Sequence, residues 1–125
     1  MINDMIKDYK KEFFRNIDYP KVSIIIPCKK IGFFEKECIT YCQKLNYSNF
    51  DIIILPDNKE ELYSNNKNMK VVSTGSVTPS EKRNLGILKS SGDIIAFIDS
   101  DAYPDSQWLK NAVSHLMNNR EIGLI

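Results

Sequence analysis

Two carboxylates, Asp99 and Asp101, follow an apolar run in the segment IIAFIDSDAYP, residues 94–104. Along an extended chain, residues i and i+2 lie on the same side, roughly 6 to 7 Å apart. At an effective dielectric constant of about 20, their mutual repulsion is on the order of 2 to 3 kcal/mol. A divalent cation would relieve it, because Mg²⁺ and Mn²⁺ prefer oxygen ligands and commonly bridge to a phosphate. The alternative is structural: Asp favours helix caps and turns.

Four short runs rich in β-branched residues are each too short to form a helix and are predicted to be strands. Such runs are typical of strands buried on both faces of a largely parallel sheet. They are residues 22–26, 51–55, 70–73 and 93–98.

Three further segments have helical spacing of apolar residues: 33–45, 78–92 and 105–119. The second has the clearest start, because Thr78 can cap it, Pro79 suits the first helical position and Glu81 completes a capping box. Gly92 suits its exit. The third has one apolar face. That face is formed by Trp108, Leu109, Ala112, Val113, Leu116 and Met117.

This alternation of strands and helices predicts an α/β, doubly wound domain with a mostly parallel sheet and helices on both faces. Such domains bind ligands beyond the carboxyl ends of their strands. Three of the predicted strands end in polar segments: 27–30 (PCKK), 56–58 (PDN) and 99–104 (DSDAYP). We therefore expect these segments to converge on one site.

The composition limits the class of protein. The chain has 125 residues, the size of one domain, and a net charge of +1 from 17 basic and 16 acidic residues. A dedicated nucleic-acid binder would show a basic excess, so no nucleic-acid partner is expected. Three cysteines, an odd number, favour reduced thiols and a cytoplasmic protein. We see neither a secretory leader nor an apolar run of the ~18 residues that a membrane span needs.

Several other side chains allow both a functional and an ordinary interpretation. Arg83 lies near the start of a helix that would face the strand ends, yet most arginines are solvated surface charges. Lys29 and Lys30 could neutralise a phosphate or only solubilise a loop. Asp57 suits a turn, although its carboxylate could accept a hydrogen bond from a base. Cys38 and Cys42 fit a buried apolar stripe better than a metal site, and His115 is assigned no role.

The segments VSIIIPCKK, DIIILPDN and SEKRNLGILKSSGDIIAFIDSDAYPDSQWL, in this order and spacing, resemble the family 2 glycosyltransferases of the GT-A fold. The resemblance covers residues 21–125 and is most specific from Arg83 to Leu109. It implies a site for a nucleotide-diphosphate sugar, with a UDP-sugar as the expected donor. It also implies a role in cell-wall or polysaccharide biosynthesis and transfer with inversion.

The resemblance further implies a role for each matching residue. Pro27, Cys28 and Lys29 would line the nucleotide, largely through their backbone, Asp57 would contact the base, and Arg83 would lie beside the base or the diphosphate. Asp99 and Ser100 would also bind the donor. Asp101, with Asp99, would hold the divalent ion, Mn²⁺ or Mg²⁺.

The chain departs from the family pattern in three places. Pro56 and Asp57 stand where the family often has two Asp residues, and Cys28 to Lys30 replace its usual Thr-Tyr-Asn. The acceptor half, which supplies the general base in family members, is expected beyond Ile125. We therefore interpret the chain as the amino-terminal, donor-binding half, truncated after the Asp-x-Asp strand and the following helix and inactive alone, with an unknown acceptor.

Residues 1–20 are predicted to form a separate amphipathic helix before the domain of residues 21–125. Ile2, Ile6, Tyr9, Phe13 and Ile17 lie along one helical face. Packing on its own domain is the favoured interpretation. Peripheral contact with the inner face of the membrane is the alternative, supported by the basic residues of the same segment.

Two other functional classes fit parts of the sequence. An Asp-x-Asp after an apolar strand also occurs in phosphatases of the haloacid dehalogenase type, which need further motifs downstream. A non-catalytic module that binds a nucleotide or another protein needs no acceptor half. Titration with UDP, with and without a metal ion, distinguishes these classes.

Overall fold

The computed structural model describes residues 19–62 and 68–119 of the chain. Within them, four strands and three helices alternate as the apolar pattern predicts. In chain order they are β1 (Val22–Pro27), α2 (Phe33–Gln43), β2 (Phe50–Leu55), β3 (Met69–Val71), α3 (Pro79–Lys89), β4 (Ile94–Phe97) and α4 (Trp108–Asn118). The predicted amino-terminal helix, except for its last two residues, lies outside the described residues.

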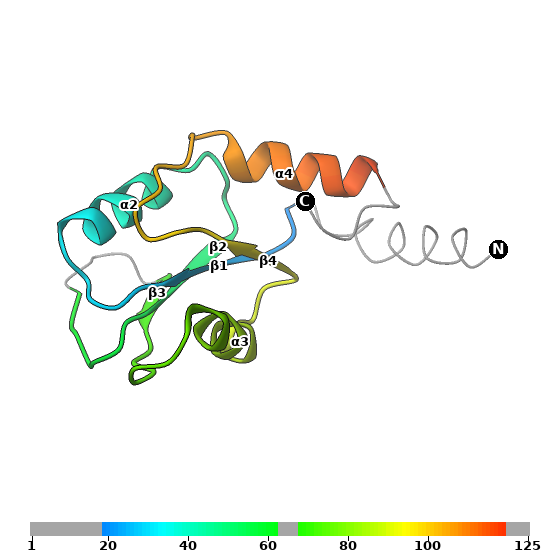
Figure 1. Cartoon of the computed structure of the whole chain (residues 1–125). Helices are drawn as coiled ribbons and strands as arrows, with labels where there is room; N and C mark the ends of the chain where they lie inside the picture. Colours follow the sequence, from blue (N-terminus) through cyan, green and yellow to red (C-terminus); the bar gives the residue numbers. More distant parts are fainter. Residues whose placement is uncertain (1–18, 63–67, 120–125) are drawn as a thin grey trace.

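The strands form one parallel sheet in the order β3-β2-β1-β4. β1 pairs with β2 on one side and β4 on the other, so that Ile24 lies opposite both Ile52 and Ala96. Because all four strands run the same way, their carboxyl ends meet at one edge of the sheet (Figure 1). The parallel sheet predicted from the sequence is confirmed.

Helices cover both faces of the sheet: α2 and α4 lie on one face and α3 on the other (Figure 1). The side chains of alternate residues of β1 point to opposite faces of the sheet. Ile24 and Ile26 belong to the larger core, with Cys38 and Cys42 of α2. Ile25 belongs to the smaller core, against which Leu85 of α3 packs. The two cysteines are fully buried, as the apolar stripe predicts.

Burial on both faces is confirmed for β1 and β2 but is wrong for the other two strands. Ile52 to Leu55 of β2 are completely buried. In contrast, β4 has only partly buried residues and ends on Phe97, which is 42% exposed. In the described part of the sheet β4 and β3 are the edge strands, and an edge strand has one neighbour fewer to cover it.

The start of α3 is as predicted, whereas its end is not. The Thr78 hydroxyl accepts a hydrogen bond from the backbone N–H of Glu81 at 3.2 Å, and Pro79 occupies the first turn. The helix ends at Lys89, and the extended backbone of Ser90 caps it. Gly92 therefore lies in the next loop instead of at the helix exit.

Gly92 is required there for a close approach to the sheet. Its N–H donates to Ser23 Oγ over 2.9 Å, and a Cβ at this position would lie 2.6 Å from the Ser23 backbone nitrogen. Only glycine fits against another backbone at that distance. The glycine that the sequence assigns to a helix exit thus brings the α3–β4 loop against β1.

Candidate functional site

The segments that follow β1 and β4 and the first turns of α2 and α3 surround one open pocket of about 450 Å³ at the carboxyl edge of the sheet. This volume lies within the usual range for small-ligand sites, roughly 300 to 1,000 Å³. All of the predicted site residues line it except Asp57. The lining residues are Pro27, Cys28, Lys29, Phe34, Glu35, Val77, Pro79, Lys82, Arg83, Asp99, Ser100 and Asp101.

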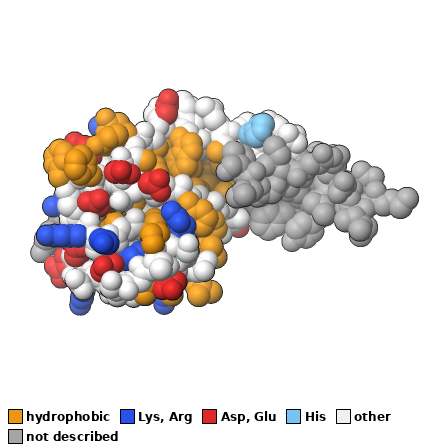
Figure 2. Space-filling view, in the orientation of Figure 1, with side chains coloured by type: hydrophobic (Ala, Val, Ile, Leu, Met, Phe, Trp, Pro, Cys, Tyr) orange, Lys and Arg blue, Asp and Glu red, His pale blue; other side chains and the backbone are white. Residues whose placement is uncertain are grey.

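Charges of both signs gather at this end of the molecule. Figure 2 shows Lys, Arg, Asp and Glu side chains interleaved on the side away from the grey residues. In the pocket itself, Lys29 and Arg83 provide positive charge, and Asp99 and Asp101 provide negative charge. Such a mixture suits a ligand that carries phosphate groups together with a cation.

Asp99 and Asp101 lie on a turn, so the extended geometry assumed for them from the sequence is wrong. β4 ends at Phe97, and the backbone N–H of Ala102 donates to the Asp99 carbonyl at 3.0 Å. Both carboxylates are exposed to solvent. Because solvent screens exposed charges, the repulsion between them is smaller than in a buried strand.

Arg83 reaches the Asp-x-Asp turn from the first turns of α3. Its Nη2 lies 3.7 Å from Asp99 Oδ1, and the Asp99 side chain is 78% exposed. An exposed pair at this distance contributes little to stability, typically under about 1 kcal/mol. Both groups therefore remain available to a ligand in the pocket.

The sequence interpretation missed Lys82, which is the best-anchored charged group of the site. Its side chain is only 3% exposed. Its Nζ lies 2.7 Å from Asp57 Oδ1 and donates to Thr74 Oγ1 at 2.8 Å and to the Leu55 carbonyl at 3.1 Å. The sequence does contain a signal for this burial. Lys82 precedes Leu85 and Gly86 by three and four positions, so it lies on the same inward face of the helix.

Asp57 itself is fixed by its backbone as well as by Lys82. Its N–H donates to the Lys29 carbonyl at 3.0 Å, and its own carbonyl accepts from Gly75 N–H at 2.8 Å. The N–H of Cys28 likewise donates to the Leu55 carbonyl at 3.2 Å. These bonds continue the parallel ladder past the strand ends, and they hold this end of the site rigidly.

Cys28 lies on this same wall with an unreactive thiol. It is 8% exposed, and burial raises the pKa of the Cys28 thiol to about 12, with a further contribution from the nearby Glu35 carboxylate. The thiol is therefore neutral at physiological pH. Its contribution to the pocket is one of shape.

Cys38, on the buried face of α2, contacts the Asp-x-Asp turn from the side of the core. Its thiol donates to the Asp99 carbonyl at 3.6 Å. Hydrogen bonds from the Cys42 thiol and from the Ala102 N–H lower the pKa of Cys38. The hydrogen bond between Cys42 and Cys38, together with burial, raises the pKa of Cys42. One helical turn of α2 thus contacts both ends of the turn that carries the carboxylates.

The donor atoms of the site fit a metal ion that a ligand helps to bind. No cluster of three or more His, Cys, Asp or Glu side chains suited to a metal occurs among the residues that the structure describes. Asp99 and Asp101 offer hard oxygen donors beside the pocket, whereas Glu35, the third carboxylate of the lining, accepts a hydrogen bond from Gly32 N–H at 2.9 Å. Mg²⁺ typically takes one or two carboxylates and completes its shell with water and substrate phosphates, which matches this donor set.

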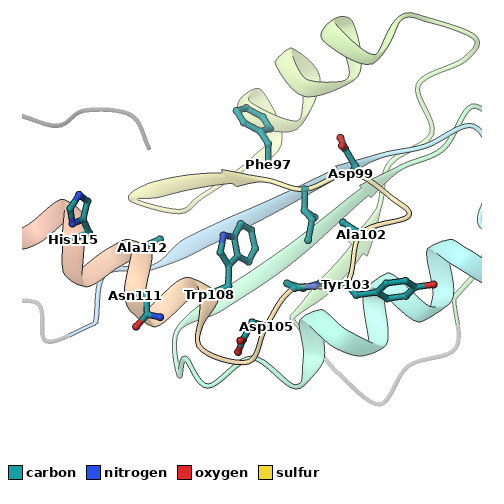
Figure 3. Close-up of a pocket in the computed structure, with 11 residues that line it drawn as sticks. Phe97, Asp99, Ala102, Tyr103, Asp105, Trp108, Asn111, Ala112 and His115 are labelled. Carbon is teal, nitrogen blue, oxygen red and sulfur yellow. The ribbon is translucent and has the colours of Figure 1, made fainter.

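A second, larger hollow of about 780 Å³ lies on the other side of the Asp-x-Asp turn, between β4 and α4. Figure 3 shows Phe97, Trp108 and His115 along it, with Tyr103 extending toward α2. Asp99 lines both hollows. The lining of the larger hollow is mostly apolar around Trp108, whereas the smaller pocket is lined by charged residues. His115, to which the sequence assigned no role, lies at this wall.

Fold and site together define an α/β domain whose ligand pocket lies at the carboxyl edge of a parallel sheet. Comparison with known proteins identifies the family. The model of Glycosyl transferase family 2 matches residues 23–125, and the chain belongs to this family. The family assignment confirms the resemblance seen in the sequence and overturns the alternative of a dehalogenase-type phosphatase.

Relatives and solved structures agree with this assignment. An uncharacterized glycosyltransferase of Haemophilus influenzae is 25% identical over 112 residues, which cover 82% of this chain and 45% of the relative. The poly(ribitol-phosphate) beta-N-acetylglucosaminyltransferase TarS of Staphylococcus aureus is 26% identical over 107 residues, covering 77% of this chain and 19% of TarS.

The crystal structure of S. aureus TarS 1–349 in complex with UDP-GlcNAc superposes with a TM-score of 0.69 at 25% identity. The match covers 78% of this chain and 31% of that one. The predicted GT-A fold is confirmed by this similarity and by the parallel sheet. The chain spans less than half the length of these relatives, and no described helix is long and apolar enough to cross a bilayer.

Proposed function

We propose that this chain binds the donor of a family 2 glycosyltransferase, a nucleotide-diphosphate sugar with UDP as the expected nucleotide. The observation that carries the proposal is the convergence of Lys29, Arg83, Asp99 and Asp101 on one pocket in a chain of this family. The TarS structure with UDP-GlcNAc supports it, because that neighbour shares the fold.

Each end of the pocket has a proposed role. Beside the rigid end, Asp57, which contacts the lining residue Lys82 but does not itself line the pocket, accepts a hydrogen bond from the base. Pro27 and Cys28 line the nucleotide. At the other end, Arg83 and Lys29 compensate the negative charge of the diphosphate, and Asp99 and Ser100 contact the donor. Asp101, with Asp99, holds Mn²⁺ or Mg²⁺. When bound, such an ion stabilises the charge that develops on the leaving diphosphate.

Sugar transfer itself, with inversion, is proposed for a protein that also supplies the acceptor side. A general base must deprotonate the incoming hydroxyl group. We expect that base from a segment outside this sequence, since the chain covers less than half of its relatives. The chain by itself is expected to bind the donor without transferring the sugar.

The test is calorimetric titration with UDP in the presence and absence of Mn²⁺. We expect binding that is at least tenfold tighter with the metal and an Asp101→Asn variant that loses this gain, because an amide is a weaker ligand than a carboxylate. Asp105→Asn is the matched control, an exposed acid outside the pocket. Metal-independent binding, or an unaffected Asp101→Asn, would contradict the metal assignment; absence of UDP binding would contradict the function.

The amphipathic pattern of residues 1–20 supports a smaller proposal. We infer that this segment packs on its own domain and that the protein is cytoplasmic. Co-sedimentation with anionic vesicles tests this proposal, since the basic residues of the segment would favour such a surface. Binding to the vesicles would instead indicate attachment at the inner face of the membrane.

A further inference from the structure

Lys82 is buried at a position that is electrostatically unfavourable for a cation. It lies in the first turns of α3, close to the amino-terminal end, where the helix dipole disfavours positive charge. Its side chain is 3% exposed, so it has also lost most of its hydration. A lysine at this place needs strong compensation from its neighbours.

The compensation comes from three partners in two separate segments, the end of β2 and the loop after β3. The Asp57 carboxylate follows β2, the Thr74 hydroxyl follows β3, and the Leu55 carbonyl ends β2. An ammonium group has three hydrogens, and these contacts use all of them. Lys82 thus cannot bind a phosphate of the donor without losing one of these partners, although it lines the pocket.

The contact with Lys82 restricts what Asp57 can do. Lys82 occupies Oδ1, and the backbone of Asp57 is held on both sides, so the carboxylate cannot easily rotate. Oδ2 is the oxygen through which it can accept another hydrogen bond without competing with Lys82. An ionised carboxylate accepts but does not donate. It therefore favours a base that presents an N–H, such as the imide of uracil, over one that presents a ring nitrogen acceptor, such as cytosine.

We propose that Lys82 is a positioning residue that fixes the Asp57 carboxylate and thereby sets the base selectivity of the donor site. The inference rests on the proposed function and deepens it. Lys82 acts through Asp57, whereas its neighbour Arg83 faces the Asp-x-Asp turn at the other end of the same pocket.

The test compares the affinities for UDP and CDP, both with Mn²⁺, in the wild type and in Lys82→Met. We expect the wild type to prefer UDP and the variant to lose about tenfold of that preference, since one charge-assisted hydrogen bond has this order of effect. Lys29→Met is the matched control in the same pocket. It should weaken both nucleotides by a similar factor and leave their ratio unchanged.

Two further variants separate positioning from a general structural role. Thr74→Val removes one partner of Lys82 and should lower the UDP to CDP ratio by a smaller factor, even if Lys82→Met does not fold. In an Asp57→Asn background, Lys82→Met should change the ratio no further, because the side chain through which Lys82 acts has been altered.

An unchanged ratio in folded Lys82→Met, or an equal loss in the Asp57→Asn background, would overturn the inference while leaving the proposed function intact. If Lys82→Met does not fold, an unchanged ratio in Thr74→Val overturns it. A wild-type protein that binds neither nucleotide would overturn both. Thermal melting of each variant identifies those that fold.

Discussion

The thiol of Cys38 donates a hydrogen bond to the carbonyl oxygen of Asp99 across 3.6 Å, although the two residues are 61 positions apart. A helix of the core thus contacts the turn that carries the carboxylates of the site. The side of the pocket next to Asp57 is held by an ion pair and several backbone hydrogen bonds. The Asp-x-Asp end depends on fewer and weaker contacts, and its geometry should be sensitive to Cys38.

Replacement of Cys38 by Ala should weaken metal-dependent UDP binding by roughly fivefold, corresponding to the loss of about 1 kcal/mol of hydrogen bonding. Titration calorimetry with Mn²⁺ measures this change. Cys42→Ala is the control, because Cys42 is equally buried on the same helix, and in the described part of the chain the hydrogen bond to the turn comes from Cys38. Equal losses in both variants would show that the effect comes from core packing.

Gly86→Ala should destabilise the protein by about 1 to 3 kcal/mol, the usual cost of overpacking a core. An added Cβ would lie 2.6 Å from Cγ2 of the fully buried Ile25. Helix propensity alone would favour Ala over Gly by roughly 1 kcal/mol, so the sign of the change decides between the two effects. Urea unfolding measures it, with Asn84→Ala, an exposed site on the same helix, as control.

Thr78→Ala should cost about 1 kcal/mol through loss of the amino-terminal cap of α3. Because α3 carries both Lys82 and Arg83, the same change should also weaken UDP binding slightly. Urea unfolding and calorimetry measure the two effects. Ser80→Ala, exposed in the same turn and not the cap, should be nearly neutral; similar costs for both would contradict the capping role.

Stability should fall as the pH rises from about 9 toward 12. Burial raises the pKa of Cys28 from near 9 and that of Tyr47 from near 10, each to about 12. The folded state holds these protons more tightly, so their contribution is complete below pH 9 and is lost as the pH approaches 12. Urea unfolding between pH 7 and 11 measures this loss.

Tyr47→Phe provides the control for the alkaline loss. Its hydroxyl donates to the Pro20 carbonyl, so the variant should be less stable by about 1 kcal/mol at pH 7. Above pH 10 it should lose less stability than the wild type, since the Tyr47 hydroxyl no longer titrates. A parallel decline in both proteins would contradict the role of Tyr47.

The sequence was sufficient to predict the order and type of the described elements and the meeting of three strand ends. Parallel strands in an α/β alternation necessarily bring their carboxyl ends to one edge, so Lys29, Arg83 and Asp101 could be placed together without coordinates. The edge position of β4 was missed because β4 and β1 have similar runs of apolar residues. The exposure of a strand depends on its neighbours in the sheet, and the sequence of the strand itself does not specify them.

Lys82 was missed for a different physical reason. Lysine is among the least often buried residues, and Lys82 stands between two other charged residues in a helix that begins at the surface. Its burial depends on Asp57 and Thr74, which lie on separate loops. Only the three-dimensional arrangement of these loops turns an ordinary lysine into a fixed part of the site.

The central position of β1 in the sheet has a consequence for how the chain is made. β1 pairs with β2 soon after both are synthesised, but its other neighbour follows much later, as the 72 positions between Lys21 and Asp93 show. At about 5 to 20 residues per second, that segment follows after roughly 4 to 14 s. Closing so long a loop costs on the order of 4 kcal/mol in chain entropy. Until β4 is synthesised, the backbone N–H and C=O groups on that edge of β1 lack their strand partner, and the two ends of the pocket come together only when β4 pairs there.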